Sequence, residues 1–215
     1  VVVTYPTDGK PGSSNPNTYT GDMVIPASVT YEGHTYQVTG IGDYALRYAT
    51  ITSLTLPEGI VSIGEEAIYN TLITELTLPN SLVTMGKYAM AYNSSLTKVT
   101  FGQNIATNEW GAWVLYRESP EYDIYMDCHE KPTVPDKYTF DHGYASRIHV
   151  YSDVYDAFAA DAYWGGKYTI VPDMGGEVTL ISFTVDGIKY EMVTEDKVVV
   201  TYPTDGKPGS SNPNT

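Results

Sequence analysis

Short alternations of apolar and polar residues recur along the middle of the chain at a nearly constant distance. The clearest are Leu54-Thr55-Leu56, Leu76-Thr77-Leu78 and Val99-Thr100-Phe101. An alternation with a period of two predicts a short, half-buried β-strand. Pro57 and Pro79 follow the first two at once. Because proline cannot donate to a sheet ladder, each of these strands is expected to be only about four residues long.

A second motif lies between the predicted strands and repeats at the same interval. It consists of Ile or Met, glycine, two variable residues, alanine and a large apolar residue. The glycines are Gly42, Gly64 and Gly86, 22 residues apart, and the alanines are Ala45, Ala67 and Ala89. Glycine at a bend indicates either a positive φ or a close approach of two backbones. We expect the alanine and the large residue after it to point inward.

The fixed period predicts a solenoid, because one coil cannot bury its apolar positions whereas stacked coils can. We therefore predict a mostly β, right-handed, single-layer solenoid with a parallel sheet over residues 41–174. Its last turns, from Trp110 onward, are expected to be degenerate. Further strands are predicted at 122–128, 147–151 and 168–171.

These motifs resemble the BspA-like leucine-rich repeats of bacterial surface proteins. The resemblance covers roughly residues 22–174 and depends on the Leu-Thr-Leu-Pro element, the Ile-Gly-x-x-Ala-aliphatic element and their spacing. Repeats of this family usually carry Phe and then Cys after the alanine. Here Leu46, Ile68 and Met90 stand in place of the Phe, and no Cys follows. The resemblance implies a leucine-rich-repeat solenoid from a cell-surface or extracellular protein.

The two ends of the solenoid are predicted to carry different caps. Residues 1–40 begin with a Val-rich strand and a Pro/Gly/Ser/Asn loop, and they contain a hairpin that turns at Glu32-Gly33. At the other end, the spacing of apolar residues predicts a short cap helix over 153–164. Residues 175–182, which contain Gly175-Gly176, are expected to be a linker.

The sequence Val1 to Thr18 is repeated without change from Val198 to Thr215. The simplest explanation of the offset of 197 residues is a parent protein built of near-identical modules, and the alternative is an artificial duplication of one end. Residues 183–215 then form the start of the next module's cap, beginning with a hairpin that turns at Asp186-Gly187. We expect residues 183–215 of one molecule to complete, or to compete for, the cap at 1–40 of the next.

The composition narrows the choice of partners. With 26 acidic against 12 basic residues, the net charge of −14 argues against nucleic acid and anionic membranes. No apolar run is long enough to insert into a membrane. Twenty tyrosines against four phenylalanines fit either a wet binding surface or half-exposed positions of a thin solenoid. The single cysteine, Cys128, is expected to be a buried apolar group.

The sequence contains none of the motifs that usually carry chemistry. We find no phosphate-binding loop, no paired cysteines at zinc spacing, no nucleophile elbow and no calcium loop. The four histidines are scattered over a hairpin, a loop and a strand. We therefore expect no catalytic residues, no metal site and no cofactor.

The alternation itself predicts the best candidate binding surface. If the apolar residues of each strand point inward, the residues between them form a row on the outside of the sheet, and solenoids commonly bind along such faces. The predicted row is Thr55, Thr77, Thr100, Tyr125 and His149, flanked by Ser53, Glu75 and Lys98. The alternative is that these threonines only satisfy β propensity.

Three functions are compatible with the sequence. The first is a non-catalytic surface binding or adhesion module that recognises a protein partner or a like module. The second is a structural spacer or self-assembling fibre module. The third is a carbohydrate-binding domain, suggested by the aromatic and acidic content.

Overall fold

A computed structural model describes residues 1–6, 17–107, 109–116, 122–133, 147–175, 182–185, 188–194 and 197–201. The chain divides into two compact units, Val1–Met174 and Gly175–Thr215. The division falls at the start of the linker expected at 175–182, of which residues 176–181 lie outside the described residues.

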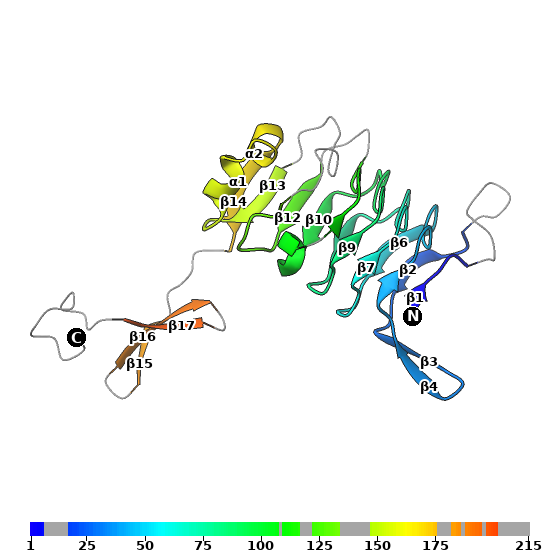
Figure 1. The fold of residues 1–215 in the computed structure, drawn as a ribbon, viewed down its shortest axis with the longest axis horizontal. Coiled ribbons are helices and arrows are strands. Elements are labelled where there is room, and N and C mark those ends of the chain that lie inside the picture. The colour runs from blue at the N-terminus through cyan, green and yellow to red at the C-terminus, as the bar shows by residue number, and fades with distance from the viewer. Residues whose placement is uncertain are drawn as a thin grey trace, which may run out of the picture. The chain divides into compact units, whose positions relative to one another are not determined.

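The first unit is a β-solenoid with two parallel sheets (Figure 1). One sheet has the order β1-β5-β7-β9-β11 and consists of two-residue strands. They are β1 (Val2–Val3), β5 (Gly40–Ile41), β7 (Ser62–Ile63), β9 (Thr84–Met85) and β11 (Glu109–Trp110). β5, β7 and β9 come from the Ile/Met-Gly motif, for which the sequence predicted a bend and no strand, so this sheet adds to the predicted sheet of alternating strands. Trp110 pairs with Met85 in this sheet, so the turn at 110–116, which was expected to be degenerate, stacks on the preceding coil.

The second sheet consists of the predicted alternating strands. Its order is β14-β13-β12-β10-β8, all parallel. The strands are β8 (Glu75–Thr77), β10 (Lys98–Phe101), β12 (Asp123–Met126), β13 (Arg147–Tyr151) and β14 (Thr169–Met174). In the preceding coils, β6 (Thr50–Thr55) pairs in parallel with β2 (Thr20–Val24), and these two strands form a separate small sheet.

The hairpin predicted near the N-terminus is present. β3 (Ser28–Tyr31) and β4 (His34–Gln37) pair antiparallel. Glu32 and Gly33 form the turn with φ of 49° and 78°. Two successive positive φ angles are those of a type I′ turn, whose twist matches that of the flanking strands.

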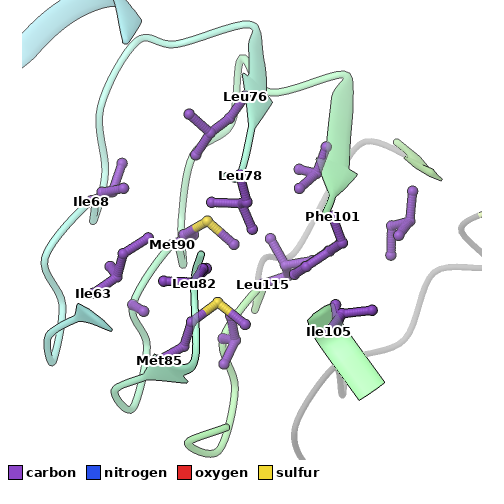
Figure 2. Close-up of a cluster of buried hydrophobic side chains, with 14 of the residues drawn as sticks. Ile63, Ile68, Leu76, Leu78, Leu82, Met85, Met90, Phe101, Ile105 and Leu115 are labelled. Carbon is purple, nitrogen blue, oxygen red and sulfur yellow. The ribbon is translucent and has the colours of Figure 1, made fainter. Parts of the chain in front are cut away.

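One hydrophobic core lies inside the stacked coils, and both sheets contribute to it. Ala45, Ala67 and Ala89 are fully buried, as predicted. The large residues that follow them, Leu46, Ile68 and Met90, are buried in the same core, and Figure 2 shows Met90 beside Leu78. Because the alanine side chain is small, the larger apolar side chains around it can fill the interior of each coil at normal packing density.

The repeated glycines are required by close approach, not by a positive φ. A Cβ on Gly64 would lie 2.6 Å from the backbone nitrogen of Asp43, in the coil before. The positive φ angles fall two residues later, at Tyr44, Glu66 and Tyr88. Each coil thus has a glycine where backbones touch and a left-handed residue where the chain turns.

The cap helix expected over 153–164 is wrong in extent, because the structure has two short helices. They are α1 (Tyr155–Ala159) and α2 (Trp164–Lys167). The Asp161 carboxylate accepts hydrogen bonds from the backbone N–H groups of Tyr163 (2.8 Å) and Trp164 (3.1 Å). An aspartate bonded in this way starts a new helical turn and ends the old one. The cap still closes the core, since Phe158 and Trp164 are both buried. A 3-10 helix, η1 (Gln103–Thr107), lies between β10 and β11.

The second unit is a three-stranded antiparallel sheet in the order β15-β16-β17. Its strands are β15 (Ser182–Val185), β16 (Ile188–Thr194) and β17 (Lys197–Thr201). β15 and β16 form the hairpin predicted over 183–192, with Phe183 opposite Tyr190. The predicted turn at 186–187 lies outside the described residues. β17 contains the second copy of the Val-Val-Val-Thr sequence.

Candidate binding surface

The outer side of the second sheet carries two polar rows, because the parallel strands are paired in register. Thr77, Thr100, Tyr125 and His149 are successive partners across β8, β10, β12 and β13. Two residues earlier on the same strands, Glu75, Lys98, Asp123 and Arg147 are partners in the same way. We call these the threonine row and the charged row, and together with Ser53 and Thr55 of β6 they make up the polar face.

Seven of the eight residues predicted for this surface are accessible to some degree. Ser53, Thr55, Glu75 and Thr77 are exposed, whereas Lys98, Thr100 and Tyr125 are half-buried. His149 is the exception, with only 6% of its surface exposed. The prediction that its side chain is available on the outside of the sheet is therefore wrong.

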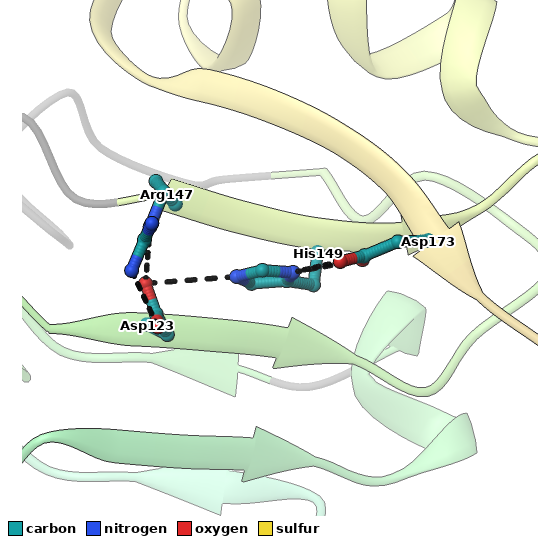
Figure 3. Close-up of polar contacts among 4 residues, drawn as sticks. All are labelled: Asp123, Arg147, His149 and Asp173. Carbon is teal, nitrogen blue, oxygen red and sulfur yellow. Dashed lines mark hydrogen bonds and ion pairs between the residues drawn. The ribbon is translucent and has the colours of Figure 1, made fainter.

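His149 is covered by its neighbours on both sides. Its ring stacks on Tyr125 with centroids 4.2 Å apart and planes within 7°. Nδ1 lies 2.7 Å from a carboxylate oxygen of Asp173, and Nε2 lies 3.5 Å from Asp123 (Figure 3). A register irregularity between β13 and β14 after His149 accompanies this placement of Asp173. Strand alternation predicts the direction of a side chain but not what covers it.

The charged row extends beyond the residues predicted from the sequence. Arg147 donates to both carboxylate oxygens of Asp123, from Nε at 2.8 Å and from a terminal nitrogen at 2.9 Å. Lys98 lies on the other side of Asp123 in register, with Nζ 4.6 Å from the centre of the Tyr125 ring. Asp123 and Arg147 were missed, although they precede Tyr125 and His149 by the same two residues that separate Glu75 from Thr77.

The charges along this row alternate, and the pairing has an electrostatic consequence. The hydrogen bonds from Arg147 hold the pKa of Asp123 below its ordinary value. Burial raises the pKa of Tyr125, which keeps its hydroxyl protonated. At neutral pH the row therefore presents, in order, a negative, a positive, a negative and a positive side chain from Glu75 to Arg147.

Replacing Asp123 by asparagine should lower the free energy of unfolding at neutral pH by about 1 kcal/mol. This is the usual contribution of a partly exposed, bidentate ion pair. The pKa of Asp123 is lower in the folded than in the unfolded chain. Its contribution is therefore complete above the unfolded pKa and is lost as the pH falls through the folded one. Urea unfolding followed between neutral and acidic pH measures this effect.

The control is the same substitution in an Arg147→Gln background, where the ion pair is already absent. There, Asp123→Asn should change stability little. An equal loss in both backgrounds, or a loss that persists unchanged into acid, would contradict the assigned pair.

A groove crosses the start of the polar face. Its volume is about 470 Å³, and Thr55, Glu75, Thr77 and Thr100 are among its lining residues. It lies where β6 and β8, which belong to different sheets, follow one another in the stack. Leu54 and Leu76 also line it, so the groove presents both apolar and polar side chains. Such a combination suits an extended polypeptide better than a compact ion.

Tyrosines form a separate ladder on the turns that follow the first sheet. Tyr48, Tyr69, Tyr92 and Tyr116 lie in successive coils, with ring centroids 5.6, 5.0 and 5.0 Å apart. Arg47 lies 4.8 Å and 5.2 Å from the first two ring centres. Because these rings contact one another from coil to coil, the ladder accounts for part of the tyrosine excess by packing.

The other candidate reactive groups are the Cys128 thiol and possible metal ligands. Cys128 is buried, as predicted, and burial raises the pKa of its thiol to about 12, which disfavours the reactive thiolate. Among the described residues, no three His, Cys, Asp or Glu side chains gather closely enough to hold a metal ion. None of the helices in this part of the chain is long and apolar enough to cross a membrane.

The stacked coils, with a glycine and an alanine in each repeat, define a leucine-rich-repeat solenoid. Residues 27–117 match the family described as BspA type leucine rich repeat region, in six copies. The crystal structure of the pneumococcal vaccine antigen PcpA shares the fold, with a TM-score of 0.54 and 22% sequence identity. The similarity covers 72% of this chain and 36% of that one, so the chain spans just over a third of the antigen's length. No curated protein sequence matches the chain.

Proposed function

We propose that this chain is a non-catalytic protein-binding module of an extracellular or cell-surface protein, and that it binds its partner along the polar face. The main support is the register of the second sheet, which sets the threonine row beside the charged row across four strands. A regular row of this kind suits an extended surface of a partner protein.

The order of charges along the row favours a protein partner over a polyanion. Glu75 and Asp123 alternate with Lys98 and Arg147, so a complementary partner must also carry both signs. The groove beside Thr55 and Thr77 adds apolar side chains that a side chain of the partner can contact. The leucine-rich repeats and the fold shared with a vaccine antigen are consistent with this role.

The test combines a protein array with a glycan array and then uses two variants. Thr77→Arg places a large cation at the rim of the groove, whereas Thr35→Arg places the same group on the exposed hairpin strand β4. We expect a protein ligand whose affinity falls about tenfold or more with Thr77→Arg, the effect of losing a central contact. Thr35→Arg should leave the affinity unchanged.

Other outcomes would contradict the proposal in different ways. Binding to glycans alone favours the carbohydrate-binding alternative. No ligand on either array, together with ordered polymers, favours the spacer or fibre module. Equal losses with both arginine variants would remove the polar face as the binding site.

A further inference from the structure

The two copies of the Val-Val-Val-Thr sequence form strands in two different settings. In the first copy, Val2 and Val3 in β1 pair in parallel with Gly40 and Ile41 of β5. In the second copy, the equivalent residues Val199 and Val200 in β17 pair antiparallel with Glu191 and Tyr190 of β16. The same sequence therefore forms a parallel pair with β5 and an antiparallel pair with β16.

A strand has two edges, so one strand of this sequence can pair with β16 and β5 together only if the two take opposite edges. The carbonyls of Val1 and Val3 accept hydrogen bonds from the N–H groups of Thr39 (2.9 Å) and Gly42 (2.8 Å). Successive peptide groups of a strand point to opposite edges, so the carbonyl of Val2 points away from β5. Within the described residues β1 ends its sheet, and β17 likewise ends its own.

The site that holds the first copy makes specific hydrogen bonds to it but leaves much of its surface exposed to solvent. We call it the β5 slot, and it consists of the backbone of residues 39–42 and the carbonyls of Ala45 and Arg47. The side-chain amide of Asn17 donates to these two carbonyls at 3.0 and 3.1 Å, and Asn17 is itself buried. Val1 and Val2 are about half exposed, at 51% and 49%. A short, exposed strand is easily displaced.

We propose that the second copy in one molecule enters the β5 slot of another copy of the chain and displaces its Val1–Thr18 segment. The second copy contains every residue that the slot recognises, since Val198, Val200 and Asn214 correspond to Val1, Val3 and Asn17. Exchange replaces the backbone contacts of Val1 and Val3 and the Asn17 contacts by their equivalents, while the hydrogen bond from the Val1 ammonium to the Gln37 carbonyl passes to the backbone N–H of Val198. The strand that enters is already paired with β16, so the exchange adds β15 and β16 to the edge of the acceptor's sheet.

The contact joins different surfaces of the two molecules, so each molecule can give one strand and accept another. Such a heterologous contact builds chains that grow from head to tail. In the intact chain the slot is already filled by the first copy, which competes within the same molecule. Assembly is therefore expected to rise with concentration and with any change that weakens the first copy. This inference does not depend on the polar face.

The duplicated sequence supplies a matched pair of variants. Val2→Asp/Val3→Asp weakens the first copy, and Val199→Asp/Val200→Asp makes the same chemical change in the second, because aspartate disfavours strands. Analytical ultracentrifugation over a wide concentration range should show more assembly than wild type for the first variant. The second variant should remain monomeric. Circular dichroism of both variants checks that the solenoid remains folded.

A peptide with the sequence of residues 198–215 provides a second measurement. It should bind the Val2→Asp/Val3→Asp variant and disperse its assemblies by occupying the β5 slot. The proposal is wrong if that variant stays monomeric at every concentration, if both double variants assemble alike, or if the peptide leaves the assemblies intact.

Discussion

Replacing Phe101 by alanine should lower the free energy of unfolding of the solenoid by about 3–5 kcal/mol, the usual effect of emptying a buried aromatic site. Phe101 is 1% exposed and lies at the end of β10 among side chains of both sheets (Figure 2). Its ring stacks on Trp110 with centroids 5.5 Å apart. Neighbouring coils hold these side chains in place, so the cavity can close only in part.

Urea unfolding monitored by far-ultraviolet circular dichroism measures this loss. Thr77→Ala, on the exposed side of the neighbouring strand β8, is the control and should change stability by less than about 0.5 kcal/mol. A loss below about 1 kcal/mol for Phe101→Ala would show that the two sheets do not share one close-packed core.

Replacing Gly86 by alanine should destabilise the solenoid by about 3 kcal/mol, the upper end of the range for overpacking. The new Cβ would lie 2.4 Å from the backbone nitrogen of Glu65 and 2.5 Å from the carbonyl carbon of Gly64. Both atoms belong to the backbone of the preceding coil, so no side chain can rotate out of the way. The coils must separate locally, which also strains the hydrogen bond of 2.7 Å from Gly86 to Ile63.

The same substitution elsewhere in the chain is a matched control. Gly166 lies in helix α2, and nothing comes within 4 Å of a Cβ added there. Gly166→Ala should be neutral or stabilising by up to about 1 kcal/mol, because alanine restricts the unfolded chain. Thermal unfolding of both variants distinguishes the two positions. Equal melting temperatures would contradict the close approach of coils at Gly86.

The features predicted correctly from the sequence are those that depend on neighbours along the chain. The alternation around Thr77 and Thr100 led to β8 and β10, and the spacing of Ala45, Ala67 and Ala89 led to their burial. The hairpin at 28–37 follows from a Glu-Gly turn between residues with strand propensity. Such patterns repeat with each coil, so one correct assignment carries over to the others.

The features that were missed depend on contacts between coils. The two-residue strands β5, β7 and β9 have no periodicity of their own and become strands only when stacked. The helix predicted over 153–164 is divided because the Asp161 side chain bonds to backbone N–H groups. Asp173, which covers His149, is 24 residues farther along the chain. No local pattern indicates that pairing.

Local sequence patterns alone predict the solenoid, the side of each alternating strand that points inward, and every position of the polar face except Asp123 and Arg147. These follow from a period of 22 residues and from alternation, which are local properties of the chain. Three features emerge only from the folded chain: the second sheet of two-residue strands, the pairing of Arg147 with Asp123, and the need for glycine where coils touch. All three arise between residues of successive coils, whose distances are set when the coils stack.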